Sequence, residues 1–227
     1  MSHPRPLGLW SATAGNLAVA RSKHTASLLA DGRVLVVGGV NGATVLGSAE
    51  VFNPITGSWS ATSAPAGRVD HSATVLPDGR VMVIGGQATG SNPLVTSQIF
   101  DPVTGNWTGA KDLSRPRFGH TATLLPSGLV LVAGGYDDGS VGSCQLYDPA
   151  ANTWRPTGSM NFDRRSHTST LLPNGQVLVT GGISDSGQPR LRGEIYDPAT
   201  ETWTRLSADM AVARDRHAAV VLTNGDV

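Results

Sequence analysis

A nine-residue motif occurs four times along the chain, and a fifth copy begins just before the last residue. The copies lie at 31–39, 78–86, 127–135 and 174–182, and the fifth starts at 224–227. Each copy joins a turn pair such as Asp-Gly or Asn-Gly, a continuous apolar run and, in the complete copies, a double glycine. This order predicts a tight hairpin turn that leads into a strand buried on both faces.

Three further markers accompany the motif in a fixed order. An Arg-x-x-His motif precedes each copy: Arg21/His24, Arg68/His71, Arg117/His120, Arg164/His167 and Arg214/His217. A short strand that ends in an aromatic residue and an Asx-Pro turn follows each complete copy. A tryptophan lies beyond each Asx-Pro turn (Trp59, Trp107, Trp154 and Trp203), whereas Trp10 has no such turn before it. The chain is therefore a repeat of units of about 48 residues.

Each unit is predicted to contain four short strands. Strand a follows the histidine, strand b runs into the double glycine, strand c carries the aromatic residue and strand d carries the tryptophan. The a–b and c–d connections have the chemistry of tight turns, whereas the b–c connections are longer and differ in sequence. We find no extended apolar pattern of helical period, so helix should be nearly absent.

Such units bury both faces of a sheet only by packing against similar units, and radial packing produces an all-β propeller of antiparallel, four-stranded blades. We expect one domain over 1–227. Its complete units lie at about 11–59, 60–107, 108–154 and 155–203, and its partial units at 1–10 and 204–227.

The ordered markers resemble the kelch repeat, and the resemblance extends from about Trp10 to Val227. The sequence of the repeats is similar to that of bacterial kelch-containing proteins and of the propeller domain of galactose-oxidase-like enzymes. This resemblance implies a ring closed by a blade that combines strands from both termini. Here that split blade would hold strand d of Trp10, strand a after Arg214 and the start of strand b, but no strand c. Three interpretations follow: a fragment of a longer propeller, a ring completed by other copies of the chain, or a strained five-bladed monomer.

Charge and cysteine content narrow the classes of partner and site. The chain has 17 Lys+Arg and 17 Asp+Glu, which offers no argument for binding nucleic acid or a membrane, so neither is expected as a partner. The single cysteine, Cys144, excludes an intrachain disulfide and a cysteine-rich zinc site. No apolar stretch is long enough for a membrane span or a secretory signal. We therefore expect a soluble chain, either cytoplasmic or secreted with its leader removed.

Residues that recur in every unit are expected to serve the structure of each blade. The Arg-x-x-His pairs could direct several imidazoles toward one axis, but hydrogen bonds that tie neighbouring blades explain their repetition better. The same reasoning places four aromatic residues in the core (Phe52, Phe100, Tyr147 and Tyr196) and the tryptophans between blades. Glu50, Gln98, Gln145 and Glu194 open strand c and are expected to bond backbone.

Residues that do not repeat are better candidates for binding. The b–c and d–a connections emerge on one face, where Lys23, Asp70 and Asp215 also lie. The predicted ligand-binding residues on this face are Arg115, Tyr136, Asp137, Asp138, Arg165, Asp185, Arg190, Arg192 and Arg216. Arginines beside exposed aromatic rings are suited to a carboxylate or to an acidic or phosphorylated peptide. The loops 137–139 and 185–187 offer oxygen atoms to a cation, but Asx-Gly loops are usually simple turns, and no metal site is predicted.

These features favour a non-enzymatic binding or assembly scaffold for a protein, peptide or glycan, or for further copies that complete the ring. The galactose-oxidase resemblance implies a copper site with a tyrosine linked to a cysteine, but the three tyrosines and Cys144 do not match it. No catalytic residue and no cofactor is therefore predicted. Two alternatives stay open: a carbohydrate-active enzyme of the sugar oxidase, isomerase or lyase type, and a propeller piece without a natural ligand that closes by oligomerisation.

Overall fold

All regular elements in the described part of the chain are β-strands. The computed structural model describes residues 12–13, 15–62, 66–90 and 92–227, and within them it contains four four-stranded antiparallel sheets and one two-stranded sheet. These residues include no helix, and hence no helix that could cross a membrane. The expected all-β architecture of four-stranded blades is confirmed.

Each four-stranded sheet contains strands a, b, c and d in that order, and strand d runs a few residues past the predicted end of its unit in every blade. Blade 1 consists of β1 (Thr25–Leu28), β2 (Val34–Val37), β5 (Ala49–Asn53) and β6 (Ser58–Thr62). Blade 2 consists of β7 (Ser72–Val75), β8 (Val81–Ile84), β9 (Ser97–Phe100) and β10 (Trp107–Gly109). Blade 3 consists of β11 (Thr121–Leu124), β12 (Val130–Ala133), β13 (Cys144–Asp148) and β14 (Thr153–Thr157). Blade 4 consists of β15 (Thr168–Leu171), β16 (Val177–Thr180), β17 (Gly193–Asp197) and β18 (Thr202–Arg205).

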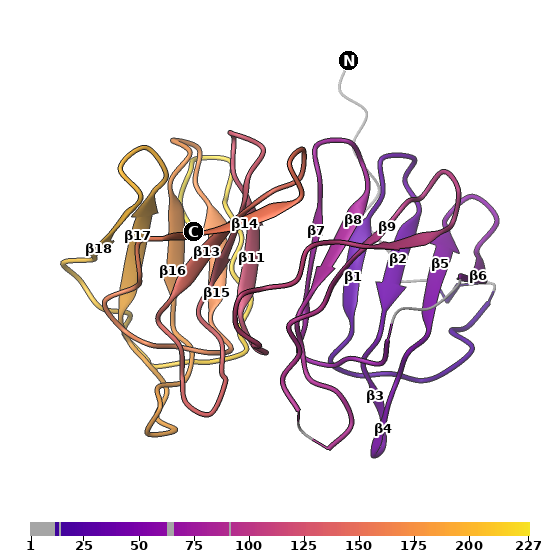
Figure 1. Cartoon of the computed structure of the whole chain (residues 1–227), viewed down its shortest axis with the longest axis horizontal. Coiled ribbons are helices and arrows are strands. Elements are labelled where there is room, and N and C mark those ends of the chain that lie inside the picture. The colour runs from indigo at the N-terminus through magenta and orange to yellow at the C-terminus, as the bar shows by residue number, and fades with distance from the viewer. Residues whose placement is uncertain (1–11, 14, 63–65, 91) are drawn as a thin grey trace.

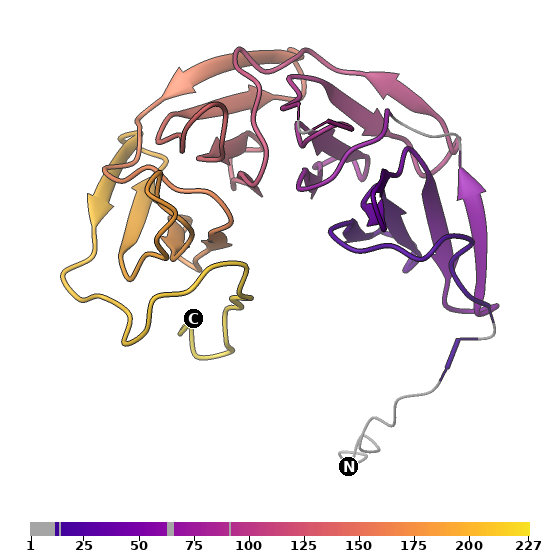
Figure 2. The same ribbon diagram turned by 90° about the horizontal axis from the view of Figure 1, so that it is seen from below.

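The blades stand side by side in an arc around a common axis (Figures 1 and 2). The a strands β1, β7, β11 and β15 are neighbours from blade to blade, so they line the axis, and the d strands lie at the outer rim. Seen along the axis, the arc is open on one side (Figure 2). The described chain thus forms four blades of a propeller arranged as an open arc.

The core lies between adjacent blades and is divided into three clusters. One cluster joins blades 1 and 2, one joins blades 2 and 3, and one joins blades 3 and 4. Strand b supplies much of this core because both of its faces are covered; in β12, for example, all four residues are buried. Three tryptophans also join blades. The Nε1 of Trp107 donates to Thr62 of β6, that of Trp154 to the carbonyl of Lys111 just after β10, and that of Trp203 to the carbonyl of Gly158 just after β14. The predicted place between blades is confirmed for these three.

The double glycine is required because the next blade approaches the backbone there. Gly134 and Gly135 have φ values of 67° and 109°, in a region that residues with a side chain rarely adopt. A Cβ atom on Gly134 would lie only 2.5 Å from the carbonyl oxygen of Arg164, the first residue of the next Arg-x-x-His motif. The glycine pair therefore closes each blade against its successor.

The structure differs from the sequence-based prediction in two places. The first b–c connection contains an additional hairpin of β3 (Val40–Asn41) and β4 (Thr44–Val45). No strand occurs in 206–227, where a lone strand a was predicted, since Asp226 and Val227 after the turn form no strand b that could pair with it. The hairpin turn of the fifth copy still forms, with Gly225 N donating to the carbonyl of Leu222. Strand d at Trp10 and the rest of 1–11 lie outside the described residues.

Candidate functional site

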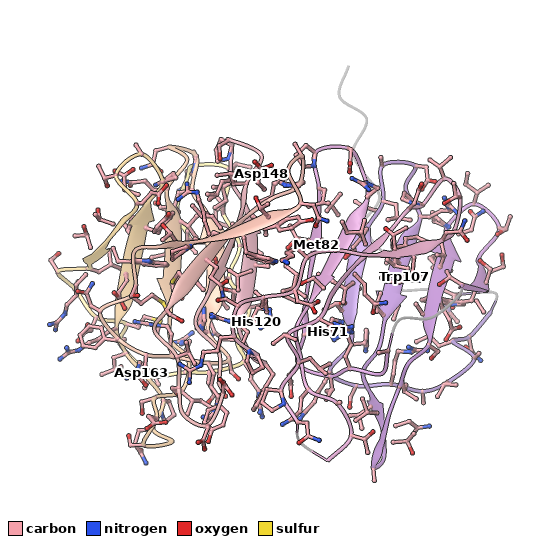
Figure 3. All side chains as sticks on the ribbon, in the orientation of Figure 1. His71, Met82, Trp107, His120, Asp148 and Asp163 are labelled. Atoms are coloured by element: carbon pink, nitrogen blue, oxygen red, sulfur yellow. The ribbon has the colours of Figure 1, made fainter. Side chains whose placement is uncertain are left out.

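The two ends of the blades differ in kind. The a–b and c–d turns gather at one end, which we call the turn face, and the b–c and d–a connections gather at the other, the loop face. Figure 3 shows this polarity, with Asp148 of a c–d turn at one end and His71, His120 and Asp163 toward the other. The variable residues predicted to bind ligand therefore share one face of the arc.

The repeated arginine of blades 1 to 4 is a buried structural element, whereas Arg214 is exposed. The Arg164 guanidinium donates to the carbonyls of Gly181 and Arg192 (2.9 and 2.7 Å) and pairs with Glu194 at 2.8 Å, where both side chains are fully buried. Its own carbonyl accepts from Gly135 of the preceding blade. Arg164 thus ties its own blade to the preceding one, and Arg21, Arg68 and Arg117 make corresponding bonds within theirs. The structural interpretation of the repeated arginine is confirmed.

The repeated histidine also joins blades. The Nε2 atoms of His71, His120 and His167 share hydrogen bonds of 2.8, 2.8 and 2.9 Å with Thr25, Ser72 and Thr121, which open strand a of the preceding unit. Burial, followed by the nearby arginine charges, lowers the pKa of His71 and of His167 to about 3, and that of His120 well below its usual value. These imidazoles are neutral at ordinary pH and act as connectors between blades.

The residue immediately before each histidine has an unusual backbone conformation. Lys23, Asp70, Gly119, Ser166 and Arg216 have φ values of 55°, 53°, 63°, 56° and 49°. Four of them carry side chains, for which this left-handed conformation is unfavourable by about 1–2 kcal/mol each. The backbone compensates through bonds between blades, since Gly119 N donates to Asp70 O, Ser166 N to Gly119 O and Arg216 N to Ser166 O.

These five residues, which we call the axial site, surround a depression near the axis on the loop face. With the buried histidines they line a cavity of about 300 Å³. Lys23 approaches Asp70 with 3.4 Å between Nζ and Oδ2, and Arg216 is exposed. The same backbone position thus presents a different side chain from each unit: cationic, anionic, absent, hydroxyl and cationic.

Six of the other predicted binding residues form two groups on the loop face. In one group, the Arg165 guanidinium lies 4.5 Å from the Tyr136 ring centroid, and Phe118 packs against the same ring at 5.3 Å. Beside this stack, Arg115 pairs with Asp137 at 2.6 Å. In the other group, Arg190 and Arg192 lie around Phe162. Arg216 belongs to the axial site, so the predicted set is distributed over three places.

The acidic loops are held by contacts within the protein. Asp185 accepts a hydrogen bond from Ser140 N at 2.8 Å, and its own backbone N–H donates to Asp163. Asp138 has a φ of 50° at its turn. Within the described ranges, no group of three or more His, Cys, Asp or Glu side chains is arranged to hold a metal ion.

Two grooves on the turn face are larger than the cavity at the axial site. A groove of about 510 Å³ lies between blades 3 and 4, beside Ser127, Asn174 and Asp197. A groove of about 490 Å³, lined by Asp78, Ser127 and Asp148, lies between blades 2 and 3. Because equivalent residues line both, these grooves follow from the repeat itself, and we regard the smaller but non-repeating axial site as the better candidate.

Sequence reasoning missed Ser166, Phe162 and Arg205 as residues of the loop face. The signal for Ser166 was available, since it precedes a repeated histidine as Lys23 and Asp70 do. Phe162 and Arg205 could have been found by asking where blade 4 departs from the other units. The Glu or Gln that opens strand c was predicted to bond backbone, and Glu50, Gln145 and Glu194 accept from backbone N–H groups. Glu50, Gln98 and Glu194 also accept from the repeated arginine of their blade.

Comparisons with known proteins agree with this architecture. The family described as the KLHDC2/KLHL20/DRC7 Kelch-repeats domain matches residues 61–227, and the kelch motif matches residues 21–63. The solved structure entitled "Structure of YjhT" is similar with a TM-score of 0.79 and 17% sequence identity, over 95% of this chain and 78% of that one. At this identity the likeness concerns the fold alone. No curated protein matches the chain.

Proposed function

The chain belongs to the kelch-repeat family, and from that premise we propose that it is a non-enzymatic binding scaffold whose loop face takes a protein, peptide or glycan ligand. Kelch-repeat blades supply a rigid support, and the connections between their strands vary without disturbing the core. In this proposal the axial site lies at the centre of the binding face.

The observation that carries the proposal is the conformation of the axial site. Strained backbone persists only where the surroundings compensate for it, and such strain is concentrated at functional sites. Here four of five successive units place a side chain at the same strained position, and backbone hydrogen bonds connect Asp70, Gly119, Ser166 and Arg216 from unit to unit. A backbone that is already fixed loses little entropy when a ligand binds.

The chemistry of the repeated residues supports binding over catalysis. A general base works best when its pKa is near the working pH, whereas the pKa values of His71 and His167 are lowered to about 3. The thiol of Cys144 is buried in β13, where desolvation raises its pKa to about 11, so it is a poor nucleophile.

The proposal is tested by screening fluorescent acidic and neutral peptides and saccharides and titrating each hit against Lys23→Ala and Arg216→Ala. Arg80→Ala is the matched control, because Arg80 is a partly exposed arginine in an ion pair with Asp78 on the turn face. Loss of affinity in the axial-site variants with no change in the control supports the proposal. Hits that respond only to the control, or chemical conversion of a hit, would refute it.

A second role, as an assembly unit that a further copy of the chain completes, is favoured by the edges of the arc. Leu28 on β1 is 68% exposed and Val220 is 65% exposed, whereas Val75 and Leu124, which match Leu28 in blades 2 and 3, are partly covered. His24 is exposed where its counterparts bond a preceding blade. Light scattering decides this point: a defined oligomer that Leu28→Glu dissociates is expected, and a monomer at all concentrations contradicts it.

A further inference from the structure

Blade 4 departs from the repeat at four positions that the fold brings together. Three arginines surround the Phe162 ring, with guanidinium carbons at 5.5 Å (Arg190), 4.8 Å (Arg192) and 5.3 Å (Arg205) from its centroid. We call this the blade-4 arginine cluster. Arg190 and Arg192 come from the b–c loop, Arg205 from the end of β18, and Phe162 from the crossover between blades 3 and 4.

The backbone hydrogen bonds show what the other blades place at these positions. Arg190 N donates to the second glycine of its blade, as do the N–H groups of Leu46, Leu94 and Val141, so an arginine replaces an apolar residue. The carbonyl of Arg192 accepts from the repeated arginine, as do those of Ser48, Thr96 and Ser143. Arg192 thus replaces a hydroxyl residue.

The positions of Arg205 and Phe162 also hold residues that the other blades lack. Arg205 lies opposite Glu194, where Ala61, Gly109 and Pro156 lie opposite the equivalent Glu50, Gln98 and Gln145. Phe162 stands five residues before its histidine, where the neighbouring units have Ala66 and Arg115. Blade stability does not require these four residues, because the other blades form without them.

The charges of the cluster are only partly balanced. Arg190 pairs with Asp163 at 2.8 Å, and Glu194 is occupied by Arg164. Within the described part of the chain, Arg192 and Arg205 have no carboxylate in an ion pair. Stacking on the Phe162 ring holds these guanidinium groups close together despite the repulsion between their charges. The paired N–H donors of a guanidinium match the oxygen atoms of a carboxylate or sulfate.

The surroundings indicate the kind of molecule that would carry the oxyanion. A cavity of about 490 Å³ adjoins Arg190 and Arg192, and its other lining includes Ser184, Ser186, Gln188 and Asp209. Hydroxyl, amide and carboxylate groups suit the hydroxyls of a sugar. The one large apolar side chain lining this cavity is Leu191, which is 39% exposed, so the cavity offers little to the apolar anchors of a peptide.

We propose that the blade-4 arginine cluster binds the sulfate or carboxylate of an acidic glycan, with Arg192 and Arg205 as the residues that contact the anion. This inference rests on the proposed role of the loop face as the binding surface. It is a separate site from the axial one, and its variants differ from those that test the axial site.

The test uses calorimetric titration of the full chain at constant ionic strength with a disaccharide of sulfated glucosamine and uronic acid. Arg192→Gln and Arg205→Gln should each weaken binding about tenfold or more. Arg192→Lys should also weaken it, because a lysine keeps the charge but not the fork. Lys111→Gln, which removes one exposed positive charge from another crossover, should leave the affinity unchanged.

Several outcomes would overturn the proposal: no binding of the disaccharide, equal binding of its neutral counterpart, an equal effect of Lys111→Gln, or equal affinity for inorganic sulfate. Tighter binding of a phosphoserine peptide would assign the cluster to a peptide instead. A further outcome is that the Arg192 and Arg205 variants leave the affinity for the disaccharide unchanged while Lys23→Ala and Arg216→Ala reduce binding of the screened hits. That result would refute the proposal for the blade-4 arginine cluster and leave the scaffold proposal intact. Unfolding of each variant in urea, unchanged from the parent chain, shows that the fold is intact.

Discussion

Acid should destabilise this fold through the histidines between its blades. His71 and His167 are buried with pKa values lowered to about 3, whereas an unfolded histidine titrates near pH 6.5. Between these two values the unfolded chain binds protons that the folded chain cannot bind. The stability contributed by neutral burial is therefore complete above about pH 6.5 and is lost progressively as the pH falls toward 3.

The size of the effect follows from the same shifts. Each buried histidine lowers the free energy of unfolding by about 1.4 kcal/mol for every pH unit below the pKa of the unfolded chain. At pH 4.5 the two histidines together therefore lower it by about 5 kcal/mol. His120, whose pKa is lowered by the same causes, adds in the same direction. Small domains are stable by about 5–15 kcal/mol, so much of the free energy of unfolding should be lost by pH 4.5.

Urea unfolding followed by tryptophan fluorescence at pH 7.0, 6.0, 5.0 and 4.5 measures this dependence. The double variant His71→Gln/His167→Gln should be less stable at pH 7, because it loses packing, yet should show a clearly shallower pH dependence. NMR titration of the imidazole protons supplies the pKa values directly. A parent chain whose urea midpoint does not change from pH 7.0 to 5.0, or a double variant with the parent's slope, would refute the reasoning.

Three further predictions concern stability and reactivity. Gly134→Ala should lower the free energy of unfolding by about 2 kcal/mol or more, because its Cβ would collide with the next blade. Gly128→Ala is the control, because Gly128 also has a positive φ but has room for a Cβ. The difference between the two variants in urea unfolding measures the effect of the collision. Glu194→Ala should lower the free energy of unfolding by about 3–5 kcal/mol, because it leaves Arg164 buried without its carboxylate partner. Glu194→Gln should lower it less, since glutamine occupies this position in blades 2 and 3. Equal destabilisation of the two variants in thermal unfolding would contradict this. Cys144 should not react with a thiol reagent until the chain unfolds, and a reaction rate in buffer equal to that in urea would disprove its burial.

The position of each complete blade could be predicted from the sequence because its signals are local and periodic. An Asp-Gly or Asn-Gly pair, a short apolar run and two glycines specify one hairpin strand, and the regular return of the motif specifies the stacking of like units. The same logic correctly predicted that the repeated arginines and histidines are structural. It failed for a strand in 206–227, where the turn forms but no strand pairs across it.

The grouping of the loop-face residues could not be predicted, because it depends on contacts between positions far apart in sequence. Arg192 and Arg205 meet on Phe162 only after strands c and d pair and the crossover from blade 3 packs beside them. The left-handed backbone of Asp70, Ser166 and Arg216 is likewise held by bonds between blades, and the preferences of those residues do not predict it.

The amino-acid sequence by itself determined the repeat, the strand order and the residues that build each blade, since these follow from alternating turn and apolar signals within about 48 residues. Only the tertiary structure decided which variable side chains lie together, because neighbouring blades bring residues about one repeat apart into contact. The double glycine shows both levels: the sequence marks where strand b ends, and the fold shows that the next blade's arginine carbonyl occupies the space where a side chain would be.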